Sequence, residues 1–266
     1  MLTTAELLQA LDTAKEAARR GAAVLEEWRS RFHVREKARF DLVTEADLGS
    51  QKAIYEHLRS RFPQHAFVGE EDAGPCVHPG AGAPPTWIVD PLDGTTNYVH
   101  DCPLYCISIG LQVAGELVVG VVYDPARKEM FAAAKGQGAF ANEQRLQTSA
   151  TDKLSEALLA TGFPPDMKGQ ERTLDWWRHF SLKTRSLRRT GSTALNMAYV
   201  AAGRFDGYWA FDNHVWDVAG AAVLIREAGG TLTNLDGSPY DPYSPDALVS
   251  NGPLHGVLLE EFRRGP

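Results

Sequence analysis

The sequence contains few cysteines, too few to stabilise the fold through disulfides. Cys76, Cys102 and Cys106 are the three in 266 residues, and they cannot form the disulfide framework on which small secreted domains depend. A reducing compartment, the cytoplasm, is therefore the expected location. His100 lies near two of them, but the spacing matches no common zinc pattern, and a free cysteine usually packs as a small buried hydrophobe.

The sequence also lacks a long apolar run and an excess of positive charge. No stretch of 18 apolar residues occurs, and Met1-Leu2-Thr3-Thr4 does not open a signal peptide, so we expect no membrane association. The formal net charge of −7 argues against a nucleic-acid partner, which would require a basic patch. An acidic protein that binds an anionic ligand would need cations at the site.

What the sequence does contain is an alternation of helical and strand-like patterns. With 266 residues, we expect one domain, 1–266, with a soft division near residue 150 into an N-terminal half and a C-terminal α/β half. Apolar spacing and capping residues predict helices at 4–28, 45–62, 171–180, 192–202 and 215–228. Strands are predicted at 105–113, 116–123, 129–134, 157–161 and 206–211, the first three as an antiparallel meander. Turns or loops are predicted at 74–85 and 135–138.

The most informative segment is 87–97, Trp-Ile-Val-Asp-Pro-Leu-Asp-Gly-Thr-Thr-Asn. Its first three residues are typical of the end of a buried strand, where unpaired negative charge is unfavourable. Asp90 and Asp93 follow directly, and they repel one another unless cations hold them. Gly94 then permits a turn, and either of the next two threonines can cap a helix whose N–H groups attract phosphate. The segment therefore indicates metal-assisted phosphate chemistry.

Three further carboxylates lie in surroundings that favour a role at the same site. Glu70 follows the apolar segment 66–69, Asp217 follows a tryptophan at the start of an apolar helix, and Asp47 lies three residues after Thr44. Such oxygen ligands suit Mg²⁺ in sites where two metals lie roughly 3.5–4 Å apart. Each carboxylate also has a simpler interpretation. Glu70 could belong to a solvated acidic loop or pair with a surface cation, and the two aspartates could be helix-cap residues.

Several segments resemble, in their order along the chain, the motifs of the inositol monophosphatase family. Segments 90–97 (DPLDGTTN) and 216–220 (WDVAG) are similar to its two signature motifs. Segments 69–71 (GEE) and 41–47 (DLVTEAD) match two further motifs. Other family segments are similar to 135–140 (KGQGAF) and 191–194 (GSTA), so the resemblance spans roughly residues 40 to 230.

The resemblance implies a mixed α+β fold, the layered αβαβα sugar-phosphatase fold, which is usually dimeric. It also implies a Mg²⁺-dependent, lithium-sensitive phosphoric monoester hydrolase that acts on inositol monophosphate or a related sugar phosphate. Alternatives within the superfamily are phosphatases for fructose 1,6-bisphosphate, a 3′-phosphonucleotide or histidinol phosphate. An alternative from another class is a regulatory binding protein that retains the fold without the activity, although the intact set of site residues speaks against it.

Matching the motifs residue by residue also implies individual roles. Glu70, Asp90 and the carbonyl of Leu92 would hold one Mg²⁺, and Asp90, Asp93 and Asp217 a second, with a weaker third beside Glu70. Thr95, oriented by Asp47, would position the attacking water, and Glu70 would assist its deprotonation. The substrate would be bound by Gly94, Thr95, Gly191, Ser192 and Thr193.

The sequence leaves the alcohol part of the substrate open. Many inositol-selective family members carry a glutamate seven residues before the aspartate of the Trp-Asp motif, and this chain has Ala210 there. Alanine accepts no hydrogen bond through its side chain, and Asp212 either compensates or is simply a surface residue. The arginines of segment 185–189 either bind a second phosphate or form a solvated basic face; they are Arg185, Arg188 and Arg189.

Overall fold

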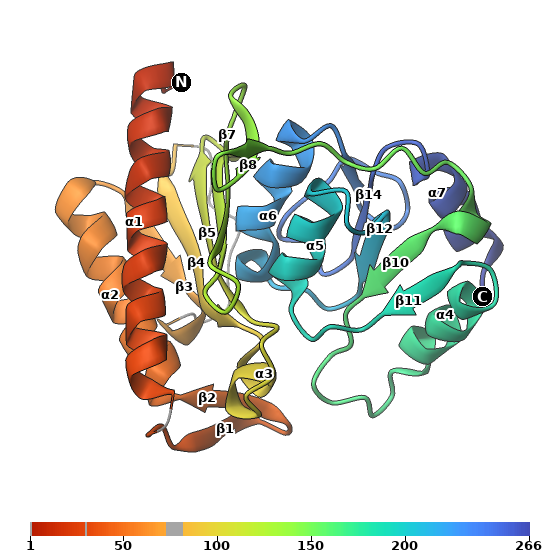
Figure 1. Cartoon of the computed structure of the whole chain (residues 1–266), viewed down its shortest axis with the longest axis horizontal. Helices are drawn as coiled ribbons and strands as arrows, with labels where there is room; N and C mark the ends of the chain where they lie inside the picture. The colour runs from red at the N-terminus through yellow and green to blue at the C-terminus, as the bar shows by residue number, and fades with distance from the viewer. Residues whose placement is uncertain (1, 30, 73–81) are drawn as a thin grey trace.

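The structure is a computed structural model that describes residues 2–29, 31–72 and 82–266. Within them the chain forms five layers, in which helices and sheets alternate (Figure 1). Helices α1 and α2 cover the seven-stranded sheet, α5 and α6 lie between the two large sheets, and α4 and α7 cover the outer face of the five-stranded sheet. The layered αβαβα fold is confirmed. The helices are α1 (Thr4–Trp28), α2 (Glu45–Arg61), α3 (Thr95–Val99), α4 (Glu171–Ser181), α5 (Thr193–Ala201), α6 (Val215–Glu227) and α7 (His255–Arg264).

The seven-stranded sheet contains the antiparallel meander that the sequence predicts. Its order is β3-β4-β5-β6-β7-β8-β9, with β3 parallel to β4 and every later neighbour antiparallel. The two ends of each helix and strand predicted above differ from the observed ends by at most one residue. The strands are β3 (Ala66–Gly69), β4 (Thr86–Asp93), β5 (Cys106–Val113), β6 (Glu116–Asp124), β7 (Glu129–Ala134), β8 (Gly138–Ala141) and β9 (Gln144–Arg145).

The five-stranded sheet has mixed strand directions, and a separate hairpin precedes α2. The sheet order is β11-β10-β12-β14-β13, with β10 parallel to both of its neighbours and β14 antiparallel to both of its own. The hairpin of β1 and β2 was not foreseen in the sequence, and neither were β9, β11, β13, β14 and α7. The remaining bounds are β1 (Val34–Ala38), β2 (Asp41–Thr44), β10 (Leu158–Thr161), β11 (Ser186–Arg188), β12 (Gly207–Ala210), β13 (Thr231–Thr233) and β14 (Ala247–Ser250).

Of the two predicted turn or loop segments, the glycine-rich segment 135–138 is a turn that leads from β7 into β8, as expected. Most of the predicted loop 74–85 lies outside the described residues. The helix after Gly94 is present as α3, but the expectation that a threonine caps it was wrong. Gly94 itself is the N-cap, in the left-handed conformation with φ 95°, and no side chain caps the helix, of which Thr95 is already the first residue. No helix in the described part of the chain is long and apolar enough to span a membrane.

The centre of the molecule is an apolar layer shared by both large sheets. One cluster joins Val122 and Phe131 of the first sheet to Tyr208 and Val249 of the second through the side chains of α5 and α6. Helix α6 approaches the first sheet at small residues. A Cβ atom built on Gly120 would lie 2.0 Å from the backbone oxygen of Gly220. This close approach fixes the N-terminus of α6, which carries one of the candidate site carboxylates.

Gly120→Ala should therefore destabilise the protein. The added methyl would force α6 away from β6, and we expect a loss of about 2–3 kcal/mol in the free energy of unfolding, measured by urea denaturation. Gly256→Ala is the control, because that glycine lies within α7 and its added methyl would contact nothing within 4 Å. This control should be neutral or stabilising by up to about 1 kcal/mol. Equal stability of Gly120→Ala and the parent would contradict the packing argument.

Candidate active site

The carboxylates predicted from the sequence come together where β3, β4 and α6 end or begin. Gly69 pairs with Val89 in the parallel register, so the next residues, Glu70 and Asp90, lie side by side where β3 ends. Strand β4 continues past an irregularity to Asp93. Asp217 reaches the same region from the first turn of α6. The structure therefore groups four predicted site residues from three elements.

Burial and mutual repulsion dominate the electrostatics of these carboxylates. Asp90 is 2% exposed and Asp93 8% exposed. Burial raises the pKa of Asp90 well above its usual range, and the charges of Glu70, Asp93 and Asp217 raise it further. Burial also raises the pKa of Asp93 to about 6. For Asp217, burial comes first and the charge of Asp93 second, and together they raise its pKa strongly. The group is electrostatically unfavourable without added positive charge.

Asp93 is fixed by the N-terminus of α5. Its Oδ2 accepts hydrogen bonds from Ser192 Oγ at 2.6 Å and from the Ala194 N–H at 2.7 Å, and its Oδ1 accepts one from the Thr193 N–H at 3.2 Å. The buried thiol of Cys106 donates to Oδ2 at 3.6 Å. These donors lower the pKa of Asp93 against the effect of burial. The Ser192 hydroxyl, which the sequence assigned to the substrate, is thus engaged by a neighbouring carboxylate.

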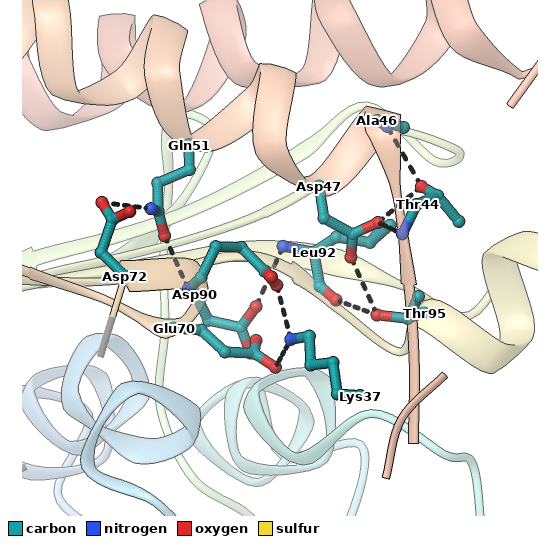
Figure 2. A network of polar contacts seen from close by, with 11 residues as sticks. Lys37, Thr44, Ala46, Asp47, Gln51, Glu70, Asp72, Asp90, Leu92 and Thr95 are labelled. Atoms are coloured by element: carbon teal, nitrogen blue, oxygen red, sulfur yellow. Dashed lines mark hydrogen bonds and ion pairs between the residues drawn. The ribbon is translucent and has the colours of Figure 1, made fainter. Parts of the chain in front are cut away.

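Asp47 connects the start of α2 to Thr95 (Figure 2). Its Oδ2 accepts from the backbone N–H and hydroxyl of Thr44, at 2.9 and 2.5 Å, as in a capping box. Its Oδ1 accepts from Thr95 Oγ1 at 3.1 Å, and the same hydroxyl lies 3.1 Å from the carbonyl oxygen of Leu92. Burial raises the pKa of Asp47 to about 6. Asp47 is therefore a helix-cap residue and also a partner of Thr95.

Asp217 is likewise both a helix-cap residue and a site residue. As the third residue of α6, it accepts the backbone N–H of His214 through Oδ2 at 2.7 Å. Within the described part of the chain, no donor contacts its Oδ1. The helix-cap interpretation from the sequence is correct, and it coexists with the placement of the side chain among the site carboxylates.

Lys37 is a site residue that the sequence analysis missed. Its Nζ lies 2.8 Å from Glu70 Oε1 and 2.7 Å from Glu71 Oε1, so the simpler interpretation of Glu70 as an ion-pair partner also holds (Figure 2). Burial raises the pKa of Glu71 to about 7 even though Lys37 acts in the opposite direction. Gln51 accepts the backbone N–H of Glu71 at 3.0 Å. No pattern signalled Lys37, because β1 is exposed along its whole length.

The donor set can be tested for its fit to a divalent metal. As the side chains stand, the described residues include no group of three acidic, histidine or cysteine side chains that could hold a metal ion. Glu70 is turned toward Lys37, and both oxygens of Asp93 accept hydrogen bonds. Asp90 uses only Oδ1, toward the Leu92 N–H at 2.9 Å, within the described residues. Buried oxygens in excess of nearby cations fit a hard cation, provided that Glu70 exchanges Lys37 for it.

Asn97 joins the two loops that carry the predicted substrate-binding residues. Its Nδ2 donates to the carbonyl oxygens of Leu104 at 2.6 Å and Thr190 at 2.8 Å. Gly94 and Gly191 both have positive φ, 95° and 88°. A Cβ atom on Gly94 would lie 2.9 Å from the Leu104 oxygen and 3.3 Å from the Gly191 oxygen. These two turns therefore require glycine both for backbone conformation and for space.

A cavity of about 490 Å³ opens beside these groups. All five predicted substrate-binding residues line it, and so do Glu70, Asp93 and Asp217, whereas Asp47, Asp90 and Leu92 do not. A second wall of the lining lies just beyond the ends of β10, β11 and β12 and contains Phe163, Arg189 and Asp212; Ala210 at the end of β12 also lines the cavity. Of the three arginines considered from the sequence, only Arg189 lines the cavity; Arg188 instead donates to Ser186 Oγ and the Leu187 carbonyl.

The five layers and the buried carboxylates beside a polar cavity define a phosphatase of the layered αβαβα class. The model of the family described as "Inositol monophosphatase family" matches residues 6–265. The chain belongs to the inositol monophosphatase family, whose members are phosphoric monoester hydrolases. The phosphatase predicted from the sequence is therefore confirmed.

The sequence relatives include several inositol monophosphatases and one protein with another name. Inositol monophosphatase 3 of Solanum lycopersicum is 41% identical over 256 residues, which cover 95% of this chain and 96% of the relative. Inositol-1-monophosphatase of Synechocystis is 39% identical over 250 residues, 92% of this chain and 85% of the relative. Nus factor SuhB of Pseudomonas aeruginosa is 42% identical over 208 residues, 77% of this chain and 76% of the relative.

Solved structures confirm the fold and show divalent metals in related proteins. The inositol monophosphatase of Anabaena has a TM-score of 0.88 and 37% identity, covering 98% of both chains. An IMPase/NADP phosphatase complexed with Mg²⁺ and phosphate has a TM-score of 0.84 and 26% identity, covering 96% of this chain and 95% of that one. The family's use of divalent metal agrees with the predicted cofactor.

The raised pKa values make metal-free stability depend on pH. Burial raises the pKa values of Asp47 and Asp93 from the ordinary 3.8 to about 6, so the folded state binds protons that the unfolded chain releases. The contribution of these two groups to the free energy of unfolding is fully present below about pH 4, and it is lost as pH rises through about 6. Added Mg²⁺ binds the ionised carboxylates, and it should raise Tm by roughly 5 °C more at about pH 7 than at about pH 5.

Calorimetry of chelator-treated protein with and without MgCl₂ tests this expectation. Asp93→Asn removes one ionisable group and should weaken the pH dependence of the Mg²⁺ effect. A Mg²⁺-induced increase in Tm that is larger at pH 5 than at pH 7 would contradict the assigned electrostatics.

Proposed function

We propose that the chain hydrolyses a phosphate monoester at the cavity beside Asp93, with inositol monophosphate or a related sugar phosphate as substrate. The observation that carries this proposal is the convergence of the buried Asp93 of β4 and the half-buried Asp217 of α6 on a cavity that Thr95 also lines. A cluster with this much uncompensated negative charge would repel a phosphate. It becomes a phosphate site once divalent cations are bound.

We propose two to three Mg²⁺ ions as the resident cofactor. The ligands would be Glu70, Asp90, the carbonyl oxygen of Leu92, Asp93 and Asp217, as the motifs imply. The oxygen-only donor set and the strongly raised pKa of Asp90 support this assignment. When bound, the metal would lower the pKa of a water and shield the negative charge that develops on phosphate and leaving oxygen.

The protein's own residues would orient the reactants. Asp47 accepts a hydrogen bond from the Thr95 hydroxyl, whose Oγ1 also lies near the Leu92 carbonyl oxygen. A lone pair of Thr95 Oγ1 would then be available to accept a hydrogen bond from the attacking water. Glu70, released from Lys37, would take the proton from that water. The N–H groups of Gly94 and Thr95 would bind phosphate oxygens, with Gly191, Ser192 and Thr193 beside the alcohol part.

The candidate substrates differ in the alcohol part of the phosphate ester. Ala210 lines the cavity and offers no side-chain acceptor to sugar hydroxyls. The alternatives are fructose 1,6-bisphosphate, a 3′-phosphonucleotide or histidinol phosphate, and one related structure contains NADP and Ca²⁺. A non-catalytic binding role is the second class of function, favoured by the relative named Nus factor SuhB. The complete set of site carboxylates supports the enzyme instead.

Four further properties belong to the same proposal. We infer one functional domain over 1–266, because the central apolar cluster joins residues on both sides of position 150. We also propose lithium inhibition, a homodimer and a cytoplasmic location, as the family resemblance and the low cysteine content indicate. We expect no nucleic-acid partner, since the net charge is −7, and no membrane partner, since no run of 18 apolar residues occurs.

Phosphate release from a panel of phosphomonoesters tests the activity. Hydrolysis should require Mg²⁺, decrease on addition of Li⁺ and cease with a chelator. The panel should contain inositol 1-phosphate, fructose 1,6-bisphosphate, a 3′-phosphonucleotide and histidinol phosphate. Absence of turnover on every ester would overturn the enzyme assignment, whereas a low rank for inositol phosphate would overturn only the substrate.

Asp93→Asn should reduce kcat by at least about 100-fold while the protein still folds, because the variant removes charge from a metal ligand with little change in shape. The expected Tm without metal is within roughly 5 °C of that of the parent, because the loss of a buried charge opposes the loss of hydrogen bonds where the amide NH2 replaces an accepting oxygen. Asp12→Asn, on the exposed face of α1, is the matched control and should retain full activity. Near-normal rates of Asp93→Asn at saturating Mg²⁺ would contradict the assigned role.

A further inference from the structure

The second wall of the cavity, formed beyond the ends of β10, β11 and β12, carries one cation with no described partner carboxylate. Lys37 and Arg189 are the lysine and arginine residues that line the cavity. Lys37 is neutralised by Glu70 and Glu71, at 2.8 and 2.7 Å. Among the described residues, no carboxylate forms an ion pair with Arg189, whose guanidinium lies 5.8 Å from the centre of the Phe163 ring. Arg189 therefore presents uncompensated positive charge to whatever occupies this wall.

The surface around Arg189 is mainly apolar and held in place. The segment Phe163-Pro164-Pro165 and Phe211 line the cavity without offering side-chain hydrogen-bonding groups. The Phe163 ring packs edge-on against Trp177, with 5.5 Å between the ring centres. The Phe211 ring lies under the Arg172 guanidinium at 3.9 Å, and Asp246 anchors that arginine at 3.1 Å. The wall is thus prearranged for an apolar or planar group rather than for a ring of hydroxyls.

Beside this wall the hydroxyls of Thr193 and Tyr208 lie 3.0 Å apart and hydrogen-bond to each other, next to two small residues. A Cβ atom built on Gly162 would lie 3.3 Å from the Cβ of Ala210, so the two small residues are neighbours. Asp212 also lines the cavity, and its Oδ2 accepts a hydrogen bond from Gln170 at 3.2 Å. The cationic group available on this wall is the fork of N–H donors on Arg189, which matches a carboxylate or a phosphate.

We propose that Arg189 is a specificity-determining residue and that the preferred substrates carry a second anionic group, a carboxylate or a phosphate, on the alcohol part of the ester. This inference rests on the proposed phosphatase function and names the substrate class of the same cavity. The hydrolysed phosphate would lie at the carboxylate wall, and the second anion would lie at Arg189. Phe163 and Phe211 would contact the carbon skeleton between them.

Matched pairs of esters test this assignment. Initial rates of phosphate release are measured in Mg²⁺ for phenyl phosphate against 4-carboxyphenyl phosphate, and for glycerol 1-phosphate against glycerol 1,3-bisphosphate. The parent should prefer the doubly charged member of a pair by roughly ten-fold in kcat/KM, since bidentate charge-assisted hydrogen bonds from an arginine contribute on this scale even where the side chain is exposed, as Arg189 is. The first pair reports a carboxylate, and the second reports a phosphate. The preference should decrease as salt is added.

Arg189→Ala should abolish the preference by raising KM for the doubly charged esters, with KM for the singly charged esters and kcat for all four unchanged. Arg189→Lys keeps the charge and should retain part of the preference. Arg188→Ala is the control, because it removes the same charge one residue away, where the guanidinium donates to Ser186 Oγ and the Leu187 carbonyl outside the cavity. This control should behave as the parent does.

The outcomes separate this inference from the proposed function. Turnover of all four esters with the preference intact in Arg189→Ala would overturn the role of Arg189 alone. The same holds if Arg188→Ala and Arg189→Ala lower the preference equally, or if the parent favours the singly charged esters. Absence of turnover of all four esters by the parent would overturn the proposed function and this inference with it.

Discussion

The rest of the structure is arranged around the repulsion between carboxylates held together where β4 of the seven-stranded sheet meets the start of α6. Asp90 and Asp93 lie on one strand, and Asp217 faces them from a helix whose sides are packed in the central apolar layer. Such a group is unfavourable on its own, because burial and like charge both oppose ionisation. The packing of α6 against β5 and β6 holds the charges together despite this, so stability elsewhere in the fold compensates for strain at the site.

Helix starts give the site its rigidity. Asp47 and Asp217 are each the third residue of a helix, and each uses one oxygen to accept the backbone N–H of its N-cap residue. That bond fixes the side-chain rotamer and leaves the second oxygen directed away from the helix. In Asp47 the second oxygen accepts the Thr95 hydroxyl. Capping and function are therefore not competing explanations for these residues, because the cap is what orients the functional oxygen.

The sequence predicts the parts of this site that depend on local patterns. Glu70, Asp90, Asp93 and Asp217 follow apolar segments or open an apolar helix, so their positions at element ends are readable without a structure. The role of Lys37 is not readable, because β1 is exposed throughout and its pairing with Glu70 spans 33 residues. Strands such as β11, β13 and β14 were missed for a related reason. They are three or four residues long, and the sheet neighbours that stabilise them are distant in sequence.

The two walls of the cavity are built in different ways, and this difference explains why the reaction is easier to infer than the substrate. The carboxylate wall belongs to β4 and α6, whose side chains are packed between layers, so a change there disturbs the core. The second wall comes from segments that follow β10, β11 and β12, where Phe163, Arg189 and Asp212 lie beyond the ends of these strands. Such connecting segments can change without unpacking a sheet. Selection can therefore alter the alcohol that is recognised while the phosphate chemistry stays in place, which makes Arg189 more informative about the substrate than any of the carboxylates.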